Sequence, residues 1–96
     1  MYAFVVLKYR YPLERIQQTT DRHRAYLREL HAQKKLVASG PFDPRDGGGL
    51  LLRVADDAEL QALLAKDPFH LEQLVDTTVH RWVPNIGVEG LDALPR

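Results

Sequence analysis

The chain of 96 residues contains no cysteine. It therefore has no disulfide, no thiolate nucleophile and no cysteine-ligated zinc site. It also lacks an excess of either charge, because thirteen Lys and Arg residues balance thirteen Asp and Glu residues. This balance leaves none of the basic surface that nucleic-acid binding normally needs. No apolar run approaches the ~20 residues that cross a bilayer, and the N-terminus lacks the parts of a signal peptide. We expect a cytoplasmic protein that binds neither nucleic acid nor membranes.

The order of the apolar segments predicts an α+β fold. Two long helical patterns alternate with strand-like runs, and the expected elements are strands at 2–9, 36–42, 49–54 and 77–83, helices at about 13–34 and 57–67, and a short helical segment at 69–74. This β-α-β-β-α-β order is the ferredoxin-like pattern with an antiparallel four-stranded sheet. In its usual strand order, 4-1-3-2, the second strand is an edge, which agrees with Pro41 because proline cannot donate a ladder hydrogen bond. We expect one domain over 1–96, with 84–96 as a C-terminal tail.

The first strand is apolar on both faces. Side chains alternate between the two faces of a strand, so one face carries Ala3, Val5 and Leu7 and the other carries Tyr2, Phe4 and Val6. Two helices cover only one face of a four-stranded sheet, and something else must cover the other. A second copy of the chain is the simplest candidate, which predicts a homodimer or a higher homo-oligomer. A cofactor or a closed internal pocket is the alternative.

Two side chains are candidates for catalysis, His23 and Asp67. His23 interrupts the mostly apolar stripe of the first helix, where it is either a general base or acid or a buried histidine that donates to a backbone carbonyl. Asp67 precedes Pro68 and is placed to cap the short helical segment. Beside His23 the same carboxylate would instead hold the imidazole tautomer and stabilise its charged form. Spacing along the chain leaves these roles open.

Six other residues are candidates for a substrate pocket: Tyr26, Ser39, Gly40, Pro41, Phe69 and Trp82. No nucleophile elbow surrounds Ser39. The run 47–49 of three glycines lacks the Lys-Ser/Thr pair and the following helix of a phosphate loop, and no flavin or nicotinamide fingerprint is present. The four histidines show no compact ligand spacing. We therefore expect a small-molecule ligand but neither a metal nor a cofactor.

Four segments of the chain are informative through their order and spacing: His23-x-x-Tyr26-Leu27, Leu36-Val37-Ala38-Ser39-Gly40-Pro41, Gly48-Gly49 and Asp67-Pro68-Phe69. With the opening strand, they resemble the YciI-like (YCII-related) family over nearly the whole chain. The resemblance implies a ferredoxin-like fold assembled as a dimeric α+β barrel, in which two sheets pack face to face. It also implies a His–Asp active site, which falls on His23 and Asp67.

The sequence departs from the family pattern at three positions. Thr20 stands where the family often has an arginine, and Lys34 and Gln73 stand where it often has glycine. With Thr20 in place of this arginine, the chain lacks a cation that would bind an anionic substrate. Arg22 and Arg53 are the candidates to replace it.

The resemblance and the His–Asp pair favour a small-molecule enzyme of lyase or isomerase type. His23 would remove a proton from a small cyclic or aromatic compound, and Asp67 would orient His23. One activity known among such proteins is dehydrochlorination of a chlorinated hydroxyquinol. Two alternatives stay open: a non-catalytic dimer that binds a small ligand or a protein partner, and a cofactor-free oxygenase of aromatic substrates.

Overall fold

The computed structural model describes residues 1–87 and 89–90, so part of the predicted tail, 88 and 91–96, lies outside the described residues. The elements follow in the order β1 (Tyr2–Tyr9), α1 (Leu13–Ala32), β2 (Leu36–Pro41), β3 (Gly47–Arg53), α2 (Asp57–Ala65), α3 (Pro68–Leu71) and β4 (Val75–Trp82). The predicted order is confirmed. Two strands begin earlier than expected, β3 at Gly47 and β4 at Val75.

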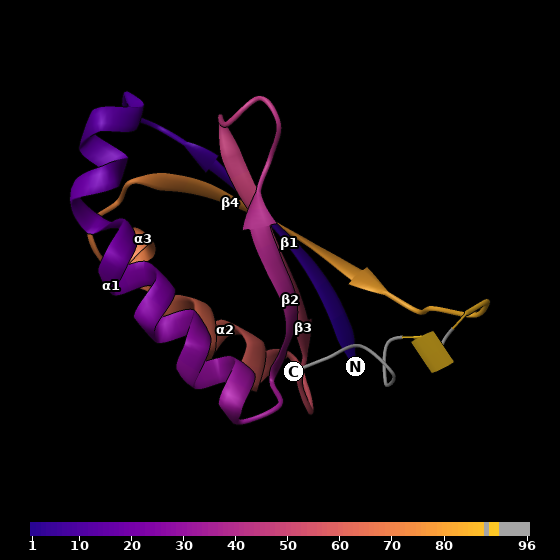
Figure 1. Cartoon of the computed structure of the whole chain (residues 1–96). Coiled ribbons are helices and arrows are strands. Elements are labelled where there is room, and N and C mark those ends of the chain that lie inside the picture. The colour runs from indigo at the N-terminus through magenta and orange to yellow at the C-terminus, as the bar shows by residue number, and fades with distance from the viewer. Residues whose placement is uncertain (88, 91–96) are drawn as a thin grey trace.

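The four strands form one antiparallel sheet in the order β2-β3-β1-β4. This is the ferredoxin-like order, and β2 is an edge strand as predicted. The helices lie together on one face of the sheet (Figure 1). Ala3, Val5 and Leu7 point to that inner face and are buried. They pack in one apolar core with residues of α1 and α2, among them Ile16 and Leu60.

The outer face of the sheet carries large side chains that no helix covers. Phe4 on β1 is 37% exposed and Trp82 on β4 is 46% exposed. The β1–β4 register pairs Tyr2 with Trp82 and Phe4 with His80, so these side chains share the outer face. The face opposite the helices is therefore aromatic and open in the single chain.

Polar residues interrupt the buried stripe of α1 at its centre. Thr19, Thr20 and His23 are all buried on this helix. The Thr20 hydroxyl donates to the carbonyl of Ile16 at 3.0 Å, which satisfies it within the helix. His23 makes its contact outside α1, so this part of the helix is built for an interaction with another element.

Lys34 and Gln73 have left-handed backbone conformations, with φ of 62° and 55°. Each follows the C-cap of a helix, Lys34 after α1 and Gln73 after α3, and in each case two backbone hydrogen bonds close the turn in a Schellman arrangement. A non-glycine residue in this conformation costs about 1–2 kcal/mol. These are the two positions at which the resemblance led us to expect glycine, which adopts this conformation without that cost.

Candidate active site

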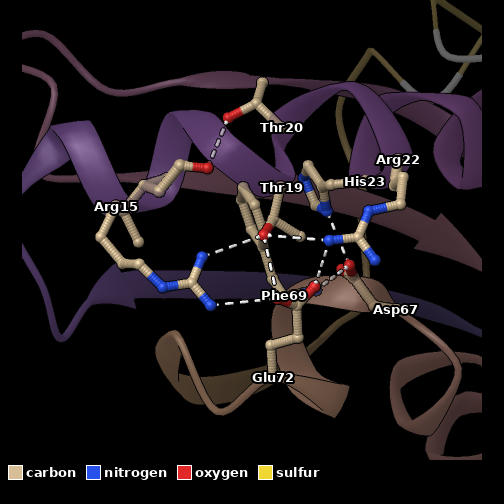
Figure 2. Close-up of polar contacts among 9 residues, drawn as sticks. Arg15, Thr19, Thr20, Arg22, His23, Asp67, Phe69 and Glu72 are labelled. Carbon is tan, nitrogen blue, oxygen red and sulfur yellow. Dashed lines mark hydrogen bonds and ion pairs between the residues drawn. The ribbon is translucent and has the colours of Figure 1, made fainter.

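His23 and Asp67 are in contact across the interface between α1 and α3. The Nδ1 atom of His23 lies 2.7 Å from Oδ1 of Asp67. Both side chains are buried, with 11% and 5% of their surface exposed. Figure 2 shows α1 presenting the imidazole to the carboxylate at the start of α3. The sequence places the two residues 44 positions apart, and only the packing of α3 on α1 brings them together.

The Asp67 carboxylate both caps α3 and holds His23. Its Oδ1 atom accepts the backbone N–H of Phe69 at 2.9 Å and also faces His23. Because an ionised carboxylate only accepts hydrogen bonds, Nδ1 of His23 is the donor. In the neutral imidazole the lone pair then lies on Nε2, which has no hydrogen-bond partner among residues 1–87 and 89–90. One oxygen atom of Asp67 therefore both caps α3 and contacts His23.

Phe69 holds the plane of the imidazole. Its ring stacks on that of His23 with a centroid separation of 3.8 Å and an interplanar angle of 6°. Tyr9 of β1 meets the same Phe69 ring edge-on at 6.2 Å. The hydrogen bond from Asp67 and the aromatic stack from Phe69 together restrict the imidazole to one orientation.

Glu72 holds the other end of α3 against α1. Its carboxylate accepts from Arg15 at 3.0 Å, from the Thr19 hydroxyl at 3.1 Å and from Arg22 at 2.8 Å (Figure 2). The pKa of Glu72 lies below its usual range mainly because of the hydrogen bond from Arg15. The Thr19 hydroxyl and the charge of Arg22 lower this pKa further. This cluster joins the two helices that carry His23 and Asp67.

We expect the Glu72→Gln variant to unfold at a lower temperature than the wild type at neutral pH. The folded state favours the charged carboxylate, so the stabilisation is complete above the ordinary glutamate pKa of ~4.3 and is lost as pH falls through the lower folded-state pKa. The difference in Tm between the two proteins should therefore shrink at acidic pH. Thermal unfolding from pH 7 to pH 3 measures this. Glu29→Gln, at an exposed position of α1, is the control, and a Glu72 variant with an unchanged Tm at pH 7 would contradict the role of the cluster.

A cavity of about 500 Å³ opens beside His23 between α1 and the β2–β3 hairpin. His23 lines it, and so do four of the predicted pocket residues: Ser39, Gly40, Pro41 and Phe69. Asp67 does not line it and lies behind the imidazole. The predicted Ser-Gly-Pro segment and the predicted histidine thus share one cavity.

Tyr26 and Trp82, the other two predicted pocket residues, lie outside the cavity lining. Trp82 points to the outer face of the sheet, because it pairs with Tyr2 in the β1–β4 register. The Tyr26 hydroxyl donates to the carbonyl of Leu63 on α2 at 2.6 Å. Burial raises the pKa of Tyr26, and the carboxylates of Asp67 and Glu29 raise it further, so this hydroxyl stays a donor. Tyr26 thus joins α1 to α2.

The sequence pattern did not indicate which cations line the cavity. Arg22 binds Glu72, and Arg53 lies beside Tyr2 on β1, so neither candidate lines the cavity. The arginines that do line it are Arg24, Arg28 and Arg45. Arg24 and Arg28 lie four and eight residues after Thr20, which puts all three on the face of α1 that lines the cavity. A basic helix face more often contacts solvent, so this spacing did not single them out in the sequence.

The described residues include neither a cluster of metal ligands nor a membrane-spanning helix. Among residues 1–87 and 89–90, no three His, Asp or Glu side chains are grouped so as to hold a metal ion. Within the same residues, no helix combines the length and apolar character needed to span a bilayer.

The four-stranded antiparallel sheet with its helices on one face makes this protein ferredoxin-like. Each of the four motifs noted in the sequence contributes at least one residue to the lining of the cavity. The chain belongs to the YCII-related family, whose domain model matches residues 2–83. The predicted family resemblance is thereby confirmed. No curated protein matches the chain.

The fold is similar to a solved structure with a bound small molecule. This is 5-chloro-2-hydroxyhydroquinone dehydrochlorinase from Burkholderia phenoliruptrix AC1100 in complex with 2,5-dihydroxybenzoquinone. The TM-score is 0.72 and the sequence identity 25%, and the match covers 86% of this chain and 95% of the other.

Proposed function

We propose that the protein is a small-molecule lyase or isomerase in which Nε2 of His23 is the general base. One observation carries the proposal: Nδ1 of His23 binds a buried carboxylate at 2.7 Å while the same imidazole lines a cavity of about 500 Å³. The bond at Nδ1 leaves the basic lone pair on Nε2. A cavity of this volume accommodates a small cyclic compound.

In the proposed step, Nε2 of His23 takes a proton from an acidic C–H or O–H group of the substrate. The imidazole becomes an imidazolium, and the charge of Asp67 stabilises it at Nδ1. Elimination of a leaving group or return of the proton to another atom then completes a lyase or an isomerase reaction. General base catalysis of this kind contributes about 10²–10⁴-fold to the rate.

The similarity to a dehydrochlorinase supports the lyase alternative. That protein is 25% identical to this chain, and the match covers most of both chains. Loss of hydrogen chloride from an organic compound requires removal of a proton, which is the role proposed for His23. Thr20 lines the cavity at a position where the resemblance leads one to expect an arginine, so the substrate is proposed to differ from those of arginine-containing members.

Proton exchange in D₂O tests this proposal without knowledge of the full reaction. Small cyclic compounds with acidic C–H groups, including hydroxylated and halogenated aromatics, are incubated with the protein and followed by NMR. Enzyme-dependent deuterium uptake or product formation is the expected result. Ligands that bind in a thermal-shift screen without either change would favour a binding module, and oxygen uptake with phenols would favour an oxygenase.

We also propose that the protein is a homodimer that buries the outer face of the sheet. The support is the exposure of Phe4 and Trp82, which the β1–β4 register places on the face of the sheet that the helices leave open (Figure 1). Phe4→Glu is expected to shift the protein from dimer to monomer in sedimentation velocity, because it places a charge in an apolar contact. Leu71→Glu, 66% exposed on the helix side, is the matched control that should stay dimeric. A wild type that sediments as a monomer would contradict this proposal.

A further inference from the structure

We propose that the cavity binds an anionic ligand, and that Arg45, assisted by Arg24 and Arg28, holds its oxyanion group. This inference rests on the proposed function, since it names the charge class of the compound that would reach His23. It assigns the substrate a small apolar ring with a carboxylate or another oxyanion.

Arg45 carries the inference. It belongs to the hairpin loop between β2 and β3, lines the cavity and is half-buried. Its Nε atom is buried and has no hydrogen-bond partner within the described residues. The loop is closed by backbone hydrogen bonds from Phe42 to Gly47 and from Asp46 to Pro44, both at 2.9 Å. An arginine is always charged, and Arg45 forms no ion pair with a described residue, so its guanidinium group, where it lines the cavity, favours a ligand that supplies an acceptor.

The cavity holds other cations and no carboxylate of its own. Arg24 and Arg28 are four residues apart on α1 and both line it, whereas no Asp or Glu does. Neither arginine forms an ion pair with a described residue. The positive charge at the cavity is therefore not neutralised by the cavity walls.

Several arginines outside the cavity form ion pairs with carboxylates. Arg10 lies beside Asp76, Arg15 and Arg22 bind Glu72, and Arg81 binds Asp57. The chain contains thirteen Asp and Glu residues for thirteen Lys and Arg residues, so acceptors are not scarce. Within the described part of the chain, carboxylates thus pair with arginines away from the cavity and leave those that line it without partners.

The aliphatic part of the cavity lining suits an apolar ring in the ligand. Aliphatic side chains from α1 and three strands form the apolar part of the wall: Leu7, Leu27, Leu36, Val37 and Leu50. The planar guanidinium group binds carboxylates and other oxyanions through paired donors. A ring against the aliphatic wall with its oxyanion at Arg45 satisfies both parts, and His23 lies in the same cavity.

Binding of simple probes tests the inference separately from catalysis. Dissociation constants for benzoate, phenylphosphate and benzamide are measured by NMR titration of the wild type, Arg45→Gln and Arg81→Gln. We expect one of the two anions to bind and neutral benzamide to bind more weakly. Arg45→Gln should weaken anion binding by about tenfold or more, since it removes a charged donor, while Arg81→Gln should leave it unchanged. The stronger anion identifies the oxyanion as carboxylate or phosphate.

Added sodium chloride should weaken anion binding to the wild type and affect Arg45→Gln less. If Arg45→Gln does not fold, the double variant Arg24→Gln/Arg28→Gln replaces it, because these exposed helix positions tolerate the change. Benzamide that binds as tightly as benzoate and phenylphosphate, or anion affinity that survives both sets of substitutions, would overturn the inference. Anion binding without any proton exchange would refute only the proposed function, and exchange with neutral compounds alone would refute only the anion site.

Discussion

His23→Gln is expected to lower kcat/KM by about 10²–10⁴-fold and to leave the protein folded. Glutamine keeps an amide N–H that can donate to the buried Asp67 carboxylate, which avoids an uncompensated charge. It has no atom that accepts a proton near neutral pH, so it removes the base and little else. The measurements are the rate of proton exchange or turnover for a substrate from the D₂O screen, and Tm for each protein.

His70→Gln is the matched control for this prediction. His70 is exposed on α3, three residues from Asp67, and does not line the cavity. Its substitution should change neither rate nor Tm. If the rate and Tm of His23→Gln fell together, so that the loss of rate followed the unfolded fraction, His23 would be a structural histidine and the proposed mechanism would be wrong.

Asp67→Asn is expected to lower the rate by up to about 10⁴-fold, the loss found when the carboxylate of a histidine–carboxylate catalytic site is replaced by an amide. Asparagine still caps α3 through its carbonyl oxygen. It loses the negative charge that stabilises the imidazolium formed when His23 takes a proton. Asp67→Ala removes the cap as well and should lose about 1 kcal/mol more of the free energy of unfolding than Asp67→Asn.

A double-mutant cycle separates positioning from a general structural effect. If Asp67 acts through His23, then the variant with both His23→Gln and Asp67→Asn should be hardly slower than His23→Gln alone. Rate losses that multiply would show that the two residues act independently. Comparison of Tm across the four proteins identifies any part of the effect that comes from stability.

The sequence predicted the architecture because its signals are local. Alternation in β1 indicated a strand with two apolar faces, and the spacing of Ile16, His23 and Leu27 indicated one buried face of α1. Pro41 marked β2 as an edge strand, and Pro68 marked the start of α3. Each of these signals depends on residues within a few positions of one another, so it can be read without knowledge of how the elements pack.

Contacts between distant segments could not be read in the same way. The sequence and the family resemblance indicated His23 and Asp67 as candidate catalytic residues. Their 2.7 Å contact, however, depends on how α3 packs against α1. Trp82 and Tyr26 were expected at the pocket. The register of β4 turns Trp82 to the outer face, and the Tyr26 hydroxyl finds a carbonyl on α2.

Local patterns in the sequence are thus sufficient to predict the α+β order of elements, the edge strand and the two candidate catalytic residues. Tertiary structure alone decided which polar groups are paired and which face the cavity. Glu72 takes Arg15 and Arg22, whereas Arg45 in the β2–β3 loop keeps a buried donor without a partner among the described residues. A sequence does not show which arginines are paired. Whether an arginine lies near a carboxylate or faces the cavity depends on how the elements pack.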